Sequence, residues 1–298
     1  MKEDSFNSVR IMTDSNSGIS PEQGKKLGIT VVPMPFFIDG KEYFEEVSIT
    51  RDDFFRCMAQ GAEISTSQPS PEGLTDLWTE TLKIYDEIVY IPMSGGLSGS
   101  VMTAKYLSED FGGRVQVVDN RRISCTQKQS VLEAAELARQ GKSAAEIREI
   151  LERTSLDCSI YIAVDTLTYL KKGGRVTPAG AAIATMLSLK PVLQIQGDKL
   201  DAFAKVRGMK AAQEKMLAAV EADMNGRFAG RQCAIKGAFT CTKAEAKAWR
   251  NLIADRFPRH KISLDPLPLS ISCHIGPGSM AIVCMPELEE APRITYEL

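Results

Sequence analysis

Residues 87–100 read EIVYIPMSGGLSGS, and this stretch decides the expected fold class. Glu87–Ile91 is a short β-rich run, glycines and serines follow it, and a helical pattern comes next. Strand-like runs alternate with helical patterns throughout the first half of the chain. The other expected strands there are Val9–Met12, Thr30–Phe37 and Arg114–Val118. Alternation of this kind predicts a mostly parallel sheet that is covered by helices on both faces.

The second half of the chain shows a different order of strand-like and helical segments. The strand-like runs Pro191–Gln196 and Leu200–Val206 flank a Gly-Asp pair, as in a hairpin, so some antiparallel pairing is expected here. An Ala-rich helix is expected over residues 178–189. Further strand-like runs and amphipathic helical patterns follow, which indicates a second α/β domain with a mixed sheet.

We therefore predict two α/β domains, one over residues 1–156 and one over residues 157–298. The first has a mostly parallel sheet with flanking helices, and the second has a mixed sheet with helices. No Pro- or Gly-rich linker marks the boundary between them. Within the first domain, Ser143 and Glu146 have the spacing of a capping box at a helix start.

Composition excludes several classes of function. A chain of 298 residues can bury a core without disulfides or a structural metal. Its 36 Lys and Arg against 38 Asp and Glu give a net charge of −2, which is not the footprint of a nucleic-acid-binding protein. Two His exclude a His-rich metal site, and the seven Cys show no C-x-x-C spacing. We expect no metal and no cofactor.

The chain shows no sign of export or membrane insertion. Its first ten residues, MKEDSFNSVR, contain no apolar segment of the kind that a signal peptide needs. The most apolar helical run, residues 179–189, is about half as long as a bilayer-spanning helix. Together with unpatterned cysteines, these features predict a cytoplasmic protein without stable membrane insertion.

The loop that contains Ser94, Gly95 and Ser98 is the sharpest local motif. Glycines and hydroxyls between a strand and a helix predict backbone N–H donors and a helix dipole, which suit an anion. The loop is not a Walker motif, because no Gly-Lys-Ser/Thr follows, and it does not fit a G-x-S-x-G nucleophile elbow. The alternative is a plain strand–helix turn that is rich in capping residues.

A second hydroxyl cluster, ISTSQPSP, spans residues 64–71 and contains Thr66 and Ser67. Its two prolines favour an extended loop that caps the next helix. Taken alone, the cluster indicates capping. Two such loops together are expected at the C-terminal edge of the parallel sheet, where open α/β sheets bind ligands.

Two glycine motifs in the second half allow both a structural and a functional interpretation. His274 begins His-Ile-Gly-Pro-Gly, which superficially fits a dinucleotide fingerprint, but a strand-like run follows where a helix is required. Next to two glycines, His274 is either structural or in close contact with a ligand. Arg175 follows Gly173-Gly174 and belongs either to a helix C-cap or to an exposed basic loop that meets a phosphate or an acidic partner.

The ordered set of motifs resembles the DegV family of bacterial fatty acid-binding proteins over nearly the whole chain. The motifs are Thr13-Asp14-Ser15, Thr66-Ser67-Gln68-Pro69-Ser70-Pro71, Gly96-Leu97-Ser98-Gly99, Tyr169-Leu170-Lys171-Lys172-Gly173-Gly174-Arg175, Leu189-Lys190-Pro191-Val192, Val206-Arg207-Gly208 and His274-x-Gly276-Pro277-Gly278. Each motif alone is weak, but their order is specific.

The resemblance implies a fatty acid that is held between the two domains. It implies that Thr66, Ser98 and His274 bind the acyl carboxylate. It further implies that a separate ATP-dependent kinase subunit phosphorylates the bound fatty acid and meets Arg175.

The head-group neighbours suggested by the same motifs are Ser67, Ser94 and Gly95. The chain departs from the family pattern in two places: Ser94-Gly95 replaces the usual Ser-Ser, and Asp119-Asn120 replaces the usual Asp-Ser. The first departure is expected to alter the hydrogen bonding of the carboxylate.

We therefore predict a carrier that presents a long-chain fatty acid to a kinase subunit, and not a self-sufficient enzyme. The chain has no phosphate-binding loop, no metal cluster and no catalytic triad in its sequence. One alternative is a lipid hydrolase or transferase that uses Ser98 and His274. Another is a lipid-sensing regulatory module.

Overall fold

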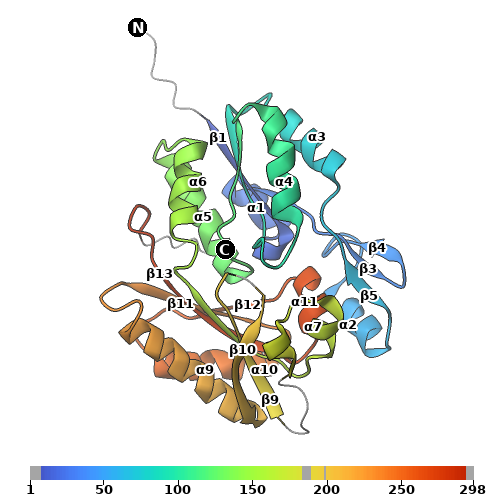
Figure 1. Ribbon diagram of the computed structural model, residues 1–298, viewed down its shortest axis with the longest axis vertical. Helices are drawn as coiled ribbons and strands as arrows, with labels where there is room; N and C mark the ends of the chain where they lie inside the picture. The colour runs from blue at the N-terminus through green and yellow to red at the C-terminus, as the bar shows by residue number, and fades with distance from the viewer. Residues whose placement is uncertain (1–7, 183–188, 198, 293–298) are drawn as a thin grey trace. The chain divides into compact units, whose positions relative to one another are not determined.

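The computed structural model describes residues 8–182, 189–197 and 199–292 (Figure 1). The chain forms two compact units. Unit 1 contains the described residues of Met1–Pro35, Ser67–Leu156 and Leu288–Leu298. Unit 2 contains those of Phe36–Thr66 and Asp157–Glu287.

The division of the chain differs from the expected pair of contiguous domains. One crossing, at Leu156, coincides with the expected boundary, but Phe36–Thr66 belongs to unit 2 and the segment from Leu288 belongs to unit 1. The reason is long-range packing: Phe36 shares a hydrophobic cluster with Leu269. A contact between residues so far apart in the sequence cannot be predicted from the local pattern of polar and apolar residues.

Unit 1 is built on a parallel sheet, as the alternation of strands and helices predicts. Its strands β1 (Val9–Asp14), β2 (Thr30–Val32), β6 (Glu87–Ile91) and β7 (Val115–Val117) pair in the order β2-β1-β6-β7. Its helices are α1 (Pro21–Leu27), α3 (Pro71–Thr81), α4 (Ser100–Ser108), α5 (Cys125–Arg139) and α6 (Ala144–Arg153), with short 3₁₀ turns at Ser15–Ser17 and Glu109–Phe111.

Each face of this sheet has its own hydrophobic core, because side chains alternate along a strand. Ile11 and Val89 pack with residues of α5 and α6, whereas Met12 and Tyr90 pack with Trp78 of α3 and with α4. The two helical layers lie on either side of the sheet in Figure 1. At the start of α6, Ser143 and Glu146 form the expected capping box.

Unit 2 contains a six-stranded mixed sheet in the order β10-β9-β8-β13-β11-β12. Its strands are β8 (Ser159–Ala163), β9 (Leu189–Ile195), β10 (Asp201–Arg207), β11 (Cys233–Phe239), β12 (Ser263–Pro266) and β13 (Met280–Pro286). Only β11 and β12 pair in parallel, and the expected hairpin is the antiparallel pair β9–β10.

Five helices accompany this sheet in the described part of unit 2. They are α7 (Thr168–Gly173), α8 (Pro178–Ala182), α9 (Gly208–Asn225), α10 (Lys243–Arg256) and α11 (Leu269–Ile275). Met216 of α9 and Trp249 of α10 are fully buried against the sheet. Of the helix expected over residues 178–189, α8 covers the start, and residues 183–188 lie outside the described residues.

A second, smaller sheet in unit 2 was not expected from the sequence. Its antiparallel strands β3 (Phe36–Ile38), β4 (Lys41–Tyr43) and β5 (Ile64–Thr66) pair in the order β4-β3-β5, beside α2 (Arg51–Ala59). The single strand expected over Thr30–Phe37 is wrong. Pro33 and Pro35 lie between β2 and β3, and proline has no N–H for a strand ladder.

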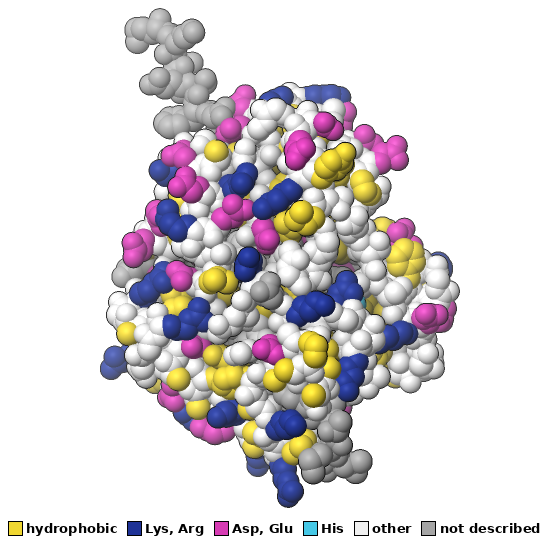
Figure 2. Space-filling model, viewed as in Figure 1, with side chains coloured by type: hydrophobic (Ala, Val, Ile, Leu, Met, Phe, Trp, Pro, Cys, Tyr) yellow, Lys and Arg dark blue, Asp and Glu magenta, His cyan; other side chains and the backbone are white. Residues whose placement is uncertain are grey.

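The surface of the face shown in Figure 2 mixes acidic, basic and apolar side chains, in keeping with the small net charge of −2. Among the described residues, no helix is both long enough and apolar enough to cross a membrane.

Candidate functional site

In unit 2 the structure brings Thr66 and His274 together. Thr66 is the last residue of β5 and His274 lies in α11, yet Oγ1 of the threonine is 2.9 Å from Nε2 of the histidine. The two residues are 208 positions apart in the sequence. Both side chains are partly buried. Two of the three residues expected to bind a carboxylate therefore form one polar contact.

Two glycines allow the helices that carry this site to pack closely. A Cβ atom on Gly173 of α7 would lie 2.1 Å from Nδ1 of His274. Reciprocally, a Cβ atom on Gly276, just after α11, would lie 2.3 Å from the ring of Tyr169 in α7. Gly276 also has a φ of +75°, which side chains disfavour. One glycine of each motif, Gly173 and Gly276, is thus required by the contact between α7 and α11.

His274 is held in its neutral form. Burial, together with the positive charge of Arg175, lowers the pKa of its imidazole to about 4, and burial is the larger cause. At neutral pH the ring therefore has one nitrogen that donates a hydrogen bond and one that accepts. A neutral donor beside a hydroxyl can bind a carboxylate without forming an ion pair.

Arg175 lies close enough to influence His274, but its side chain does not extend outward as expected. The residue is partly buried, and its Nη1 donates a hydrogen bond to the carbonyl of Gly173 at the end of α7. Gly174 has a φ of +68° and caps the helix through its N–H to Lys171. The capping alternative is confirmed for this loop, and the expected encounter with a kinase stays a prediction.

In unit 1 the loop after β6 is fixed by three separate segments. The N–H of Met93 donates to Oδ2 of Asp14 at 2.8 Å. The N–H of Ser94 donates to the carbonyl of Arg122 at 2.8 Å, and that of Gly95 donates to Oδ1 of Asp119 at 3.1 Å. Three consecutive amides are therefore held from the end of β1 and from the segment after β7.

The backbone of this loop does not offer the anion site that the glycines suggested. The N–H of Gly96 donates to Oγ of Ser94, and those of Leu97 and Ser98 donate to the carbonyl of Ser94 at 3.0 and 3.1 Å. Every amide from Met93 to Ser98 thus has a partner within the protein, which corrects the expectation. The sequence shows the glycines, but not the distant carboxylates that take their N–H groups.

The hydroxyl of Ser98 remains as the head-group candidate in this loop. Its Oγ donates to Oγ of Ser100 at 3.0 Å and accepts the N–H of Ser100 at 3.2 Å. Ser98 is partly buried, whereas Ser94 is buried. Ser67 is exposed, and its N–H donates to the carbonyl of Pro35 at the point where the chain enters unit 1.

Gly95, the first departure from the family pattern, lies beside Asp119, which directly precedes the second departure, Asn120. A Cβ atom on Gly95 would lie 2.7 Å from Oδ2 of Asp119, too close for any real side chain. Glycine at this position therefore lets the carboxylate of Asp119 take the amide directly. Asp119 itself matches the family pattern, and the sequence does not show its role in holding this loop.

Asp14 is the other carboxylate that sequence reasoning missed as a functional residue. It is fully buried, and its Oδ1 accepts the N–H of Asn16 and Nε2 of Gln127, each at 3.0 Å. Burial raises the pKa of Asp14 to about 6, although the hydrogen bonds from Met93, Gln127 and Asn16 oppose this shift. The only signal in the sequence was the Thr-Asp-Ser motif itself.

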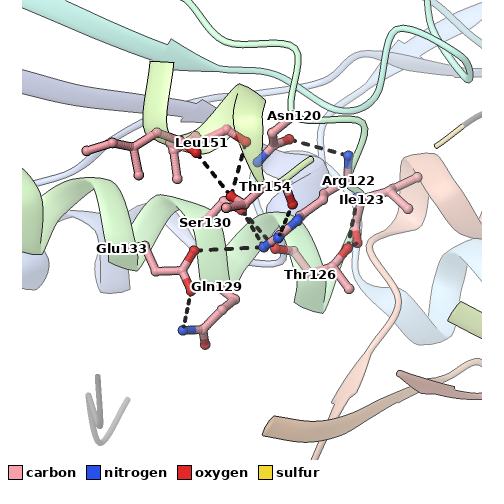
Figure 3. Close-up of polar contacts among 10 residues, drawn as sticks. Asn120, Arg122, Ile123, Thr126, Gln129, Ser130, Glu133, Leu151 and Thr154 are labelled. Atoms are coloured by element: carbon pink, nitrogen blue, oxygen red, sulfur yellow. Dashed lines mark hydrogen bonds and ion pairs between the residues drawn. The ribbon is translucent and has the colours of Figure 1, made fainter. Parts of the chain in front are cut away.

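A buried polar network supports the segment after β7 (Figure 3). Arg122 is 3% exposed, and its guanidinium donates to Oγ of Ser130 at 3.0 Å and to the carbonyl of Thr154 at 2.9 Å. Glu133 of α5 lies 3.8 Å from the same group. Because the carbonyl of Arg122 accepts the N–H of Ser94, this network fixes the loop that carries Ser98.

The described residues contain no group of three or more His, Cys, Asp or Glu side chains that could hold a metal ion.

Comparison with known proteins identifies the relatives of this chain. The family model described as "Uncharacterised protein, DegV family" matches residues 8–287. A DegV domain-containing protein of Deinococcus radiodurans is 32% identical over 94% of this chain and 99% of its own length.

Two solved structures are similar over 94% of this chain and 99% of their own. One is a fatty acid-binding DegV family protein from Thermus thermophilus, with a TM-score of 0.85 and 32% identity. The other is DegV, a fatty acid-binding protein from Bacillus subtilis, with a TM-score of 0.82 and 25% identity.

Proposed function

Because this chain belongs to the DegV family, we propose that it binds a long-chain fatty acid and presents the carboxylate to a separate kinase subunit for acyl phosphate formation. The related proteins of Thermus thermophilus and Bacillus subtilis bind fatty acids. The observation that carries the proposal is the contact between Thr66 and a neutral, partly buried His274. The proposal places this protein in the cytoplasm, where ATP is available for the kinase step.

The head-group chemistry suits a carboxylate that has to react. Thr66 and neutral His274 offer hydrogen bonds without a full positive charge, so a carboxylate oxygen bound there keeps its ability to attack a phosphate. The charge of Arg175 acts on the same position, since it lowers the pKa of His274. An incoming phosphate would gain from a guanidinium at that point.

Ser98 is proposed as a further donor to the carboxylate. In the present structure its hydroxyl donates to Ser100, so the O–H has to turn away from Ser100 when a ligand is bound. Hydroxyl rotation is easy, and a charged acceptor gives a stronger hydrogen bond than a neutral one. The fixed backbone of the loop then serves to place this one hydroxyl.

The acyl chain is expected to supply most of the affinity. Each buried methylene is worth about 0.8 kcal/mol, so a palmitate-length chain contributes roughly 12 kcal/mol at most. Association costs about 4 to 15 kcal/mol, so the chain largely offsets this cost and the head group sets the orientation.

The binding proposal is tested by native mass spectrometry of protein purified from a bacterial host. We expect a mass increment equal to one long-chain fatty acid. After removal of the lipid, titration with palmitate should show that Thr66→Val and Ser98→Ala each weaken binding by about 1 to 3 kcal/mol. Thr79→Val is the control, because the hydroxyl of Thr79 donates only to the backbone of its own helix. Protein that carries no lipid and does not bind added palmitate would refute the proposal.

The hydrolase alternative has no specific observation in its favour. Oγ of Ser98 is hydrogen-bonded to Ser100, and Nε2 of His274 is in contact with Thr66. Each residue of the supposed nucleophile–base pair thus has a different partner.

A further inference from the structure

The helix that carries His274 begins with help from a distant side chain. Pro268 precedes α11 and gives it no side-chain cap. Instead, the N–H of Leu269 donates to Oε2 of Glu45 at 2.7 Å, across 224 residues of sequence. A carboxylate at this position satisfies one of the amides that a helix start leaves unpaired, and it interacts favourably with the helix dipole.

Arg51 adds a second contact at the same place. Its Nη2 lies 3.4 Å from Oε1 of Glu45 and also donates to the carbonyl of Leu267. The two side chains therefore hold the backbone on both sides of Pro268. Glu45 accepts the N–H of Leu269, and Arg51 donates to the carbonyl of Leu267. The two side chains are 21% and 30% exposed, so solvent screens this pair less than an exposed pair.

The start of α11 determines where the ring of His274 lies. Leu269 and His274 belong to the same short helix, five residues or about 7.5 Å of rise apart. Because the helix is this short, a displacement of its start also displaces the ring of His274. Leu269 and Cys273 pack into the cluster around Phe36 and Phe54. On the other side, Gly173 leaves no spare room beside the ring. A small displacement of the helix start would therefore change the 2.9 Å contact with Thr66.

We propose that Glu45, supported by Arg51, is a positioning residue for the head-group site: it fixes the start of α11 so that His274 meets Thr66. The importance of this for ligand binding rests on the proposed function, whereas the placement of His274 does not.

A neutral side chain would not reproduce both contacts. Burial raises the pKa of Glu45, so the charged carboxylate is kept there against a desolvation cost, with the Leu269 amide and Arg51 opposing that shift. Glutamine could still accept the N–H of Leu269, but it would not form an ion pair with Arg51. Alanine would lose both contacts. The proposal therefore predicts a graded series in which alanine has the larger effect.

The direct test follows the two histidine rings by NMR as the pH is varied. The chain has only His260 and His274, so His260 serves as the internal reference. In the wild type His274 should titrate near pH 4. In Glu45→Ala we expect its midpoint to rise by about one pH unit or more, and in Glu45→Gln by less than half of that.

The direction of the shift separates displacement from simple electrostatics. Loss of the negative charge at Glu45 would, through its field alone, lower the pKa of His274. A displaced ring that gains access to water would instead titrate at higher pH, because desolvation is the main cause of its low value. Three features beside the ring are the same in every variant: the hydroxyl of Thr66, the close backbone of Gly173 and the positive charge of Arg175.

Asp157→Asn is the matched control. It removes another carboxylate of unit 2 that pairs with an arginine, since Oδ2 of Asp157 lies 2.7 Å from Arg231. His274 should titrate in this variant as in the wild type. A folded Glu45→Ala protein in which His274 also titrates as in the wild type would overturn the proposal. If Glu45→Ala does not fold, Arg51→Gln decides in its place, and an unshifted His274 there overturns the proposal as well.

Titration of delipidated protein with palmitate tests the functional consequence. Glu45→Ala should bind about tenfold more weakly than the wild type, while Asp157→Asn stays within about twofold. Wild-type affinity in Glu45→Ala would show that the placement of His274 does not matter for the ligand, against the proposal. If the wild type itself does not bind palmitate, the proposed function fails, and the NMR experiment still decides whether Glu45 positions His274.

Discussion

At the scale of single residues, Asp14 and His274 show the same physical effect with opposite signs of charge. Burial disfavours the charged form of each side chain. It raises the pKa of Asp14 to about 6 and lowers that of His274 to about 4. Each shift favours the neutral form, and each makes folding stability depend on pH in the window between the ordinary pKa of the group and its value in the folded protein.

For His274 the expected effect is a loss of stability as the pH falls. In the unfolded chain His274 is protonated below its ordinary pKa of 6.5, whereas in the folded protein it is protonated only below about pH 4. The free energy of unfolding therefore decreases between pH 6.5 and pH 4, by roughly 3 kcal/mol at most at about 1.36 kcal/mol per unit. His274→Gln should lack this decrease, as measured by urea unfolding at several pH values. His260→Gln is the control, and equal slopes in His274→Gln and the wild type would contradict the prediction.

For Asp14 the sign is reversed. Between its ordinary pKa of 3.8 and its folded value of about 6, the folded protein keeps a proton that the unfolded chain has lost. The free energy of unfolding therefore decreases as the pH rises through this window, by about 3 kcal/mol at most. Asp14→Asn should lose this dependence, so its unfolding free energy should rise more steeply with pH than that of the wild type. A less steep rise would refute the assignment.

The residues with recognisable motifs were easier to foresee than the residues that hold them. Thr66 and His274 could be named from the sequence, and the structure places them in contact. The roles of Asp14 and Asp119 could not be foreseen, because both accept hydrogen bonds from the loop after β6. This loop lies 79 residues from Asp14 and 24 residues from Asp119 in the sequence. Which carboxylate receives which amide depends on strand order, and a single sequence does not show strand order.

At the scale of elements, the contact between α7 and α11 depends on glycine. Gly173→Ala would place a Cβ atom 2.1 Å from Nδ1 of His274, so the ring or the helix has to move. We expect a destabilisation of about 1 to 3 kcal/mol and weaker palmitate binding, because overpacking displaces neighbouring side chains. Thermal unfolding and palmitate titration measure the two effects.

Gly73→Ala is the control for this substitution. A Cβ atom there would meet only Ser70, at an ordinary distance of 3.7 Å, and alanine favours the helix more than glycine does. This variant should be as stable as the wild type or more stable. If Gly173→Ala is equally stable and binds equally well, the close packing against His274 has no consequence.

Elements with a clear local pattern were predicted well, and those decided by tertiary packing were not. Glu87–Ile91 forms β6 within its expected bounds, since its apolar run is buried on both faces. Leu269–Ile275, with the sequence LSISCHI, forms α11 although no helix was expected there. Its Leu269 and Cys273 fit a cluster built by residues more than 200 positions earlier, and this packing outweighs local preference.

At the scale of the whole molecule, the sequence does not show how the chain passes between the two units. The chain passes between the two units four times, at Pro35, Thr66, Leu156 and Glu287. Only the crossing at Leu156 was expected. The insertion Phe36–Thr66 carries Glu45, Arg51 and Thr66, so it supplies unit 2 with half of the Thr66–His274 contact and with the side chains at the start of α11.

The interaction with a partner kinase also belongs to this scale, and Arg175 is the residue that tests it. Arg175→Ala should change palmitate affinity by about threefold at most, because a partly exposed charge is screened by solvent. It should nevertheless reduce acyl phosphate formation with the cognate kinase and ATP by about tenfold or more, if the guanidinium meets the phosphate during transfer. Arg175→Lys should restore little, since a point charge does not reproduce the planar fork.

The capping role of Arg175 predicts a different result for the same variants. Its Nη1 donates to the carbonyl of Gly173, so loss of the side chain would cost a few tenths to about 1 kcal/mol of stability and leave turnover normal. Lys172→Ala is the matched control, because it removes an exposed cation from the last turn of the same helix. If Arg175→Ala and Lys172→Ala support acyl phosphate formation at the wild-type rate, Arg175 is a helix cap only. A defect confined to Arg175, with palmitate affinity preserved, would show that the residue acts after binding, when the phosphoryl group of ATP is transferred to the carboxylate and ADP leaves.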